Sequence, residues 1–270
     1  MSSPSSKGLR VGGRPWVMGV LNVTPDSFSD GGEWTDVDAA VDHAIRMVDD
    51  GADVIDIGGE STRPGSTPVS VEEELSRLEP VLKALVPSID VPVSVDTMKP
   101  AVAERCIRLG VSMVNDVMGL RADGMLEVCA DGSVSVVIMH MDGDMSSVHS
   151  GVMDGDYMGR IRGFLQDRVD KVLDAGIPPD DIILDPGIGF GKTVEQNLEI
   201  LRNPLYFSKD YPVLTASSRK RFLKEVYLGM DPDEASALAA LESVNAGASM
   251  VRVHDVARTV DRIRGSKRLR

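Results

Sequence analysis

The stretch that decides the fold is residues 54–65, Val-Ile-Asp-Ile-Gly-Gly-Glu-Ser-Thr-Arg-Pro-Gly. It opens with a short apolar run, Val54 to Ile57, whose β-branched residues are typical of a strand buried in a parallel sheet. Gly58 and Gly59 end the run, and a polar cluster follows at once. A core strand that ends in this way places polar side chains at the mouth of a sheet.

Seven more apolar runs end on polar residues in the same manner. They are Val17–Asn22, Val93–Val95, Met113–Val114, Val136–Met139, Ile182–Leu184, Val213–Leu214 and Met250–Val253. Between the runs lie amphipathic helix patterns at 37–50, 70–85, 100–109, 125–130, 157–175, 194–202, 232–246 and 256–265. This alternation predicts parallel strands joined by right-handed crossovers. We therefore expect an α/β fold that is a single (β/α)8 TIM barrel, with a doubly wound sheet as the weaker alternative.

The length of 270 residues fits one barrel better than two domains. We expect one domain over residues 1–270, with 1–8 and 266–270 as loose termini. Gly12-Gly13 stands between Leu9–Val11 and Pro15–Trp16. Glycines between two short extended runs predict a β-hairpin, here one that closes the bottom of the barrel.

Composition excludes several classes of protein. The formal net charge is −13, whereas a nucleic-acid binder usually presents a basic face. No apolar run approaches the ~18 residues of a membrane span, and the polar first residues do not resemble a secretory signal. The two cysteines, Cys106 and Cys129, suggest no disulfide framework. We expect a soluble, cytoplasmic protein whose partners are neither nucleic acid nor membrane.

In a barrel, the carboxyl ends of all strands meet at one face, where active sites lie. Asp96, Asn115 and Asp185 would come from three different strands, and their groups suit a flat ligand rich in N–H donors and ring acceptors. Four cations suited to a phosphate or carboxylate are Arg63, Lys220, Arg252 and His254. Asn22 and the oxygen-rich loop after it could serve Mg²⁺ together with a substrate phosphate.

Each of these signals has a simpler explanation. A lone Asp after a strand is most often a helix N-cap, and basic residues at a barrel rim are usually solvated or paired. Gly187, Gly189 and Gly191 could be ordinary turn glycines. The run Gly-Phe-Gly-Lys-Thr at 189–193 resembles the end of a phosphate-binding P-loop, but Pro186 stands where that motif needs glycine. The joint placement of polar groups at eight strand ends is what favours a site.

Seven motifs, in order along nearly the whole chain, resemble the dihydropteroate synthase family. They are Asn-Val-Thr-Pro-Asp-Ser-Phe-Ser-Asp-Gly-Gly (22–32), Gly-Gly-Glu-Ser-Thr-Arg-Pro-Gly (58–65), Ser-Val-Asp-Thr (94–97), Met-His-Met (139–141), Leu-Asp-Pro-Gly-Ile-Gly-Phe-Gly-Lys (184–192), Ser-Arg-Lys (218–220) and Arg-Val-His-Asp (252–255). The first two are highly specific. The resemblance implies condensation of 6-hydroxymethyl-7,8-dihydropterin pyrophosphate with p-aminobenzoate, giving 7,8-dihydropteroate and pyrophosphate in folate biosynthesis.

The resemblance also implies roles for individual residues. The pterin would be held by Asp96, Asn115, Asp185 and Lys220, with Met139 and Phe190 beside the ring. The pyrophosphate and a Mg²⁺ cofactor would lie at Asn22, Arg63, Arg252 and His254. The p-aminobenzoate pocket would be shaped by Phe28, Thr62, Pro64 and Ser218. The catalytic group would be Asp96, Lys220, Arg252 and His254, and the family implies a homodimer formed through helices late in the chain.

Two other functions stay open. One is a non-catalytic or divergent pterin-binding paralogue, and the other is a pterin-dependent methyltransferase. Three residues depart from the family's usual pattern, namely Ala216, Arg221 and Asp142. The Ser-Thr-Arg-Pro and Arg-Val-His-Asp motifs favour the synthase, because a methyltransferase has no pyrophosphate to hold.

Overall fold

The computed structural model describes residues 13–24, 33–61, 67–142 and 153–267. Eight strands are found in it, at the places that the eight apolar runs predict. They are β1 (Trp16–Asn22), β2 (Val54–Gly58), β3 (Val93–Asp96), β4 (Met113–Asp116), β5 (Ser135–Met139), β6 (Ile182–Asp185), β7 (Leu214–Thr215) and β8 (Met250–Val253). All pairings are parallel, in the order β6-β5-β4-β3-β2-β1-β8-β7. A parallel bridge between Leu184 and Val213 joins the two ends, so the sheet is a nearly closed barrel.

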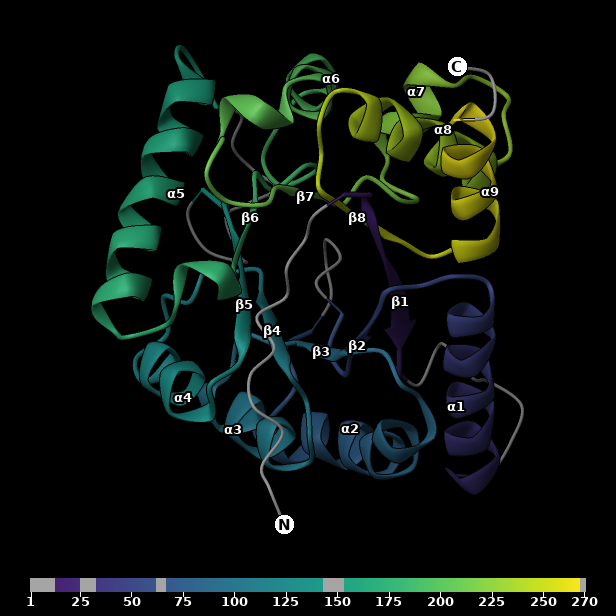
Figure 1. Cartoon of the computed structure of the whole chain (residues 1–270), viewed down its shortest axis with the longest axis vertical. Helices are drawn as coiled ribbons and strands as arrows, with labels where there is room; N and C mark the ends of the chain where they lie inside the picture. Colours follow the sequence, from purple (N-terminus) through teal and green to yellow (C-terminus); the bar gives the residue numbers. More distant parts are fainter. Residues whose placement is uncertain (1–12, 25–32, 62–66, 143–152, 268–270) are drawn as a thin grey trace.

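Helices alternate with the strands and surround them as a ring (Figure 1). The eight expected ones are α1 (Glu33–Asp49), α2 (Val71–Leu85), α3 (Pro100–Arg108), α4 (Met125–Gly132), α5 (Tyr157–Asp174), α6 (Val194–Arg202), α8 (Pro232–Asn245) and α9 (Val256–Lys267). The short pieces η2 (Val86–Ser88), η3 (Pro179–Asp181), η4 (Pro204–Tyr206) and α7 (Phe222–Val226) were not predicted. A piece of three to five residues is too short to show a helical period in the sequence.

The barrel interior carries an apolar plug, defined by Met18, Val54, Met113, Val137, Ile183, Leu214, Ala216 and Met250, which form one buried cluster. Side chains along a strand alternate between its two faces, so residues two apart point the same way. Two positions beyond Val54, Met113, Ile183 and Met250 stand Asp56, Asn115, Asp185 and Arg252. The inward face therefore changes from apolar to polar on four strands at the carboxyl end of the barrel.

The ends of the chain differ in part from expectation. The hairpin on 9–16 falls mainly outside the described residues, and Trp16, expected in its second arm, is instead the first residue of β1, in register with Met250. Helix α9 runs to Lys267, two residues into the stretch predicted as a loose terminus. Residues 1–8 and 268–270 lie outside the described part. No helix in the described part is long and apolar enough to cross a membrane.

An ion-pair clasp links the ends of β2 and β3 to helix α2. The Lys99 ammonium nitrogen lies 2.5 Å from a carboxylate oxygen of Glu60 and 2.6 Å from one of Glu74. Glu74 is fully buried. A buried carboxylate that loses its cation keeps its desolvation penalty without the compensating attraction, so Lys99 stabilises the fold at this point.

We predict that Lys99→Met lowers the free energy of unfolding by about 3 kcal/mol, measured by chemical denaturation. The matched control is Lys83→Met, which breaks a solvent-exposed pair with Glu79 and should cost about 0.5 kcal/mol or less. Equal losses in the two variants would show that the Lys99 ion pairs stabilise the fold no more than an exposed pair does.

Candidate functional site

A buried polar network crosses the barrel mouth above the apolar plug. The Arg252 guanidinium of β8 places Nε 2.6 Å from Asp56 Oδ2 and Nη2 2.7 Å from Asp96 Oδ2. Asn115 of β4 donates its amide Nδ2 to the same Asp56 oxygen at 3.0 Å. One cation, two carboxylates and one amide from four strands are thereby brought together, including the predicted Asp96, Asn115 and Arg252.

A second group gathers where β6 and β7 end. Asp185 Oδ1 accepts the Gly187 N–H at 2.7 Å. Lys220 donates to the carbonyl oxygen of Ile188, and its Nζ lies 4.7 Å from the centroid of the Phe190 ring. The predicted residues Asp185, Lys220 and Phe190 therefore share one side of the mouth.

Two glycines allow this loop to close tightly. Gly187 and Gly189 have φ of +72° and +85°. A Cβ on Gly187 would lie 1.9 Å from the carbonyl oxygen of His140, and one on Gly189 would lie 2.6 Å from the Lys220 side chain. Both positions require glycine for conformation and for space. They are more than ordinary turn glycines, because without side chains they let the loop after β6 pack directly against Lys220.

An apolar cluster borders the polar groups. Met139 and Phe190 pack with Val117 and Met141 and are 3% and 8% exposed. Because Lys220 already lies against the Phe190 ring, the apolar and charged surfaces adjoin. Such a border fits a planar, polar heterocycle, whose faces contact apolar side chains and whose edge needs hydrogen bonds.

His254 and Ser218 form the rim at β8 and β7. Ser218 Oγ lies 2.9 Å from His254 Nδ1 and accepts the His254 backbone N–H at 3.2 Å. The turn that follows Ser218 is fixed by contacts with helix α8. Arg219, a non-glycine residue at φ +59°, donates its backbone N–H to Ser236 Oγ. Its guanidinium makes two hydrogen bonds to Asp233, at 2.6 and 2.9 Å.

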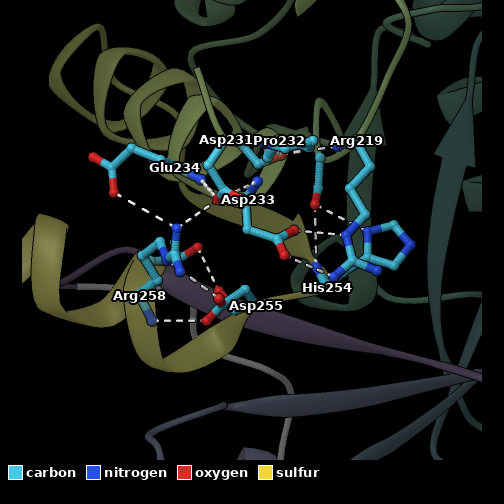
Figure 2. A network of polar contacts seen from close by, with 11 residues as sticks. Arg219, Asp231, Pro232, Asp233, Glu234, His254, Asp255 and Arg258 are labelled. Carbon is cyan, nitrogen blue, oxygen red and sulfur yellow. Dashed lines mark hydrogen bonds and ion pairs between the residues drawn. The ribbon is translucent and has the colours of Figure 1, made fainter. Parts of the chain in front are cut away.

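Figure 2 shows how this turn joins a larger charged network. Arg258 of α9 lies 2.6 Å from Asp231 at the start of α8 and 3.4 Å from Asp255. Exposed ion pairs of this kind contribute little singly, but together they fix the relative positions of the ends of β7 and β8. The network thus supports the Ser218–His254 rim without belonging to the mouth.

Asn22 ends β1 and is half-buried. A Cβ built on Gly58 would lie 3.8 Å from Asn22 Oδ1 and 3.6 Å from the Asp96 Cβ, so the Asn22 amide lies over the glycine end of β2 beside Asp96. Four other predicted site residues, Phe28, Thr62, Arg63 and Pro64, lie outside the described part of the chain.

The departures from the family pattern lie in different places. Ala216 is 8% exposed and packs within the apolar plug. Arg221 is exposed and precedes α7, and Asp142 is exposed after Met141. The extra methyl of Ala216 is accommodated inside the barrel, and the added charges of the other two face solvent.

Burial shifts the pKa values of the ionisable groups at the mouth in the direction that favours their neutral forms. The pKa of Asp96 rises to about 7, chiefly because of burial, against the attraction of Arg252 and with the repulsion of Asp56. Burial also lowers the pKa of Lys220 to about 8 and raises that of Asp185, while each opposes the other's shift by attraction. For Arg252, the attraction of Asp56 and Asp96 outweighs burial, and its pKa is raised. With pKa values near neutrality, Asp96 and Lys220 can change charge when a charged ligand binds.

Three residues of the site carry no role in the sequence analysis, namely Asp56, His140 and Lys192. Lys192 Nζ donates to the carbonyl oxygens of Gly187 and Phe190, at 2.7 and 3.0 Å, and lies 3.4 Å from His140 Nδ1. The sequence feature that could have pointed to Lys192 was its place in a glycine-rich loop. For Asp56 the signal was a carboxylate inside an otherwise apolar buried strand, two residues before Gly58.

This fold and site define a class of protein. It is an α/β barrel whose carboxyl-terminal mouth, with apolar side chains beside buried polar groups, suits a planar, polar heterocycle. A family model described as "Pterin binding enzyme" matches residues 18–254.

Individual relatives show which members of this family the chain resembles. A dihydropteroate synthase of Synechocystis sp. is 42% identical over 250 residues, which cover 91% of this chain and 86% of the relative. The Escherichia coli K12 dihydropteroate synthase is 39% identical, covering 93% and 90%. A solved Xanthomonas albilineans dihydropteroate synthase with 4-aminobenzoic acid is 44% identical, covers 95% of this chain and 93% of that chain, and has a TM-score of 0.88. The chain therefore belongs to the dihydropteroate synthases of the pterin-binding enzyme family.

His140 should make stability depend on pH. Its side chain is 4% exposed, and burial, aided by Lys192 and Arg121, lowers its pKa from 6.5 to about 3. Between pH 3 and 6.5 the unfolded chain then binds more protons than the folded chain, so stability rises with pH across this window and is lost as pH falls.

We predict that the wild type loses about 2 kcal/mol through this group between pH 6.5 and 5, and that His140→Gln abolishes this part of the loss. Denaturation of both proteins at pH 7.5 and at pH 5 gives the comparison, which does not depend on the absolute stability of the variant. Parallel losses in the two proteins would contradict a neutral, buried His140.

Proposed function

We propose that this chain condenses 6-hydroxymethyl-7,8-dihydropterin pyrophosphate with p-aminobenzoate, giving 7,8-dihydropteroate and pyrophosphate. The observation that carries the proposal is the meeting of Asp96, Asn115, Asp185 and Lys220 beside the apolar pair Met139 and Phe190 at one barrel mouth. The identity of about 40% with dihydropteroate synthases supports it. So does a solved X. albilineans relative in complex with 7,8-dihydropteroate, which is 40% identical with a TM-score of 0.83.

In this proposal the carboxylates and the amide recognise the pterin edge. Asp185 accepts N–H groups of the ring, since an ionised carboxylate only accepts and can take more than one donor. Lys220 donates to ring acceptors, and the ring lies against the side chains of Met139 and Phe190. Burial makes each such bond stronger than in water and excludes solvent from the ring.

The chemistry needs little proton transfer from the protein. The amine nitrogen attacks the pterin methylene, a C–N bond forms, and the C–O bond to pyrophosphate breaks with its electron pair on the leaving oxygen. The nitrogen then loses one proton to solvent or to the departing pyrophosphate. An aromatic amine is neutral at pH 7, so no dedicated general base is required. Stabilising the developing charge of pyrophosphate should be the main catalytic effect, and His254 and Arg252 at the end of β8 are the described cations placed for it.

Arg252 has a second role in this proposal. Its contacts with Asp56 and Asp96 place it next to the residues assigned to the pterin, so it joins the two ends of the site. Ser218, which lies against His254, would contribute to the p-aminobenzoate pocket, together with the residues assigned there by resemblance.

The residues present fit a Mg²⁺ that is held mainly by substrate. The described part of the chain contains no cluster of three His, Cys, Asp or Glu side chains that could hold a metal alone. Mg²⁺ is commonly bound by one or two protein oxygens together with substrate phosphates and waters, so the single amide oxygen of Asn22 suffices. When bound, the ion would neutralise charge on the departing pyrophosphate.

The assembly is also a proposal. Four large apolar side chains, Leu205, Tyr206, Leu228 and Met230, are exposed on η4 and on the segment between α7 and α8. We infer that this late part of the chain forms a homodimer interface, which sedimentation analysis of the wild type and of Leu228→Glu would test. The single-domain organisation and the cytoplasmic location remain predictions.

The function is tested with purified protein, the pterin pyrophosphate, p-aminobenzoate and Mg²⁺. We expect pyrophosphate and 7,8-dihydropteroate in equal amounts, and no pyrophosphate when p-aminobenzoate is left out. Chelation of Mg²⁺ should reduce the rate, as should Asn22→Ala. A pterin binder without turnover would yield binding heat in calorimetry but no product. Methyl transfer from a methylated pterin to a corrinoid protein would indicate the methyltransferase instead.

We predict that Asp185→Asn weakens pterin binding by about 1.5–3 kcal/mol, because an amide replaces the charged acceptor and turns a donor toward ring donors. Calorimetry with 6-hydroxymethylpterin measures the loss, and Asp174→Asn, an exposed position near the end of α5, is the control. Wild-type affinity in Asp185→Asn would remove this residue from the pterin site.

A further inference from the structure

Asp56 is a buried carboxylate that no motif assigns to the ligand. It is the third residue of β2 and is 0% exposed. Strand register pairs Asp56 with Ser94, and Gly58 with Asp96, which in turn pairs with Asn115. Because barrel strands are tilted and staggered, Asp56 still shares its inward layer with Asn115, Asp185 and Arg252, each two residues beyond the apolar plug. Asp56 is fully buried whereas Asn115 and Asp96 keep some exposure, so a ligand at the mouth meets those two first.

In the described part of the chain, the side-chain hydrogen bonds of Asp56 are with residues of the site. One oxygen, Oδ2, accepts from Arg252 Nε at 2.6 Å and from Asn115 Nδ2 at 3.0 Å. The other oxygen, Oδ1, is buried and has no hydrogen-bond partner among the described residues, and the same is true of the hydroxyl of its register neighbour Ser94. A buried carboxylate kept only for stability would be expected to satisfy both oxygens, because an unpaired acceptor in the interior is costly.

The contact with Asn115 has a directional consequence. An ionised carboxylate can only accept, so Asp56 requires the NH₂ side of the Asn115 amide to face it. The carbonyl Oδ1 of Asn115 must then point away from Asp56. Without this contact the two ends of the amide are nearly equivalent in shape, and either could face the ligand.

We propose that Asp56 is a positioning residue for the pterin: through its buried Oδ2 it fixes the direction of the Asn115 amide and the place of the Arg252 guanidinium. Asn115 thereby presents an acceptor to the mouth, which selects a heterocycle with an N–H donor at that edge. This inference rests on the proposed pterin-binding function and deepens it by assigning the donor–acceptor pattern of the pocket to a residue that the ligand does not touch.

The first test is Asp56→Asn in the full chain, with affinity for 6-hydroxymethylpterin measured by calorimetry. The variant has the same shape, so we expect the fold to survive, as judged by circular dichroism, and the affinity to fall about tenfold. Ser94→Ala is the matched control: it removes the unpaired buried hydroxyl of the register neighbour of Asp56, and we expect its affinity to stay within about twofold of the wild type. If Asp56→Asn does not fold, Asp56→Ser, which is smaller and neutral, replaces it.

A second measurement separates positioning from a general structural effect. The Asp56→Asn change is repeated in an Asn115→Ala background and in a Lys220→Ala background. With no amide to orient, its effect on pterin affinity should shrink in the first background. In the second it should persist, because Lys220 has no contact with Asp56 and the two changes should add.

Two results would overturn the inference: a change of less than about twofold for Asp56→Asn, or equal effects in the two backgrounds. The proposed condensation fails in a different way. A wild-type protein that binds pterin and releases no pyrophosphate would refute the enzyme while leaving the role of Asp56 open to the same measurement. A wild type that binds no pterin would refute both.

Discussion

The Arg252 guanidinium, held between Asp56 and Asp96, is the interaction on which the mouth of the barrel depends. It connects β8 with β2 and β3, and through Asp56 it reaches Asn115 on β4. Removing one member would leave buried charge without a partner, which costs far more than an exposed pair contributes. The network therefore keeps the ends of four strands at fixed distances, and a ligand meets a site that is already arranged.

The second side of the mouth is built differently, from loop geometry instead of strand register. Gly187 and Gly189 let the loop after β6 pass close to His140 and Lys220, and Lys192 fastens the loop from within by donating to two of its carbonyl oxygens. This side carries Phe190 and so determines where an aromatic face lies. Burial lowers the pKa of two groups on this side, Lys220 to about 8 and His140 to about 3.

Outside the mouth, charged pairs stabilise the turns and helices that surround it. The Arg219–Asp233 pair and the contacts of Arg258 fix the turn after β7 against α8 and α9 (Figure 2), while Lys99 joins Glu60 to α2 on the opposite side. Active positions on a barrel come from strand ends and loops, so their precision depends on such supports. The charged residues at the mouth and those that support the surrounding turns are thus separate sets.

The sequence by itself determined the eight strands, the helices between them and the family, because buried parallel strands read as apolar runs and the motifs are specific. It also predicted Asp96, Asn115, Asp185 and Lys220 as neighbours, since strand ends share one face. Only the tertiary structure decided that Arg252 is held by Asp56, and that Lys192 fastens the loop carrying Phe190. The Arg252–Asp56 contact joins residues 196 positions apart and depends on strand register and barrel closure, which no local pattern encodes. The Lys192 contacts are local, but they depend on the conformation that the loop adopts in the folded barrel.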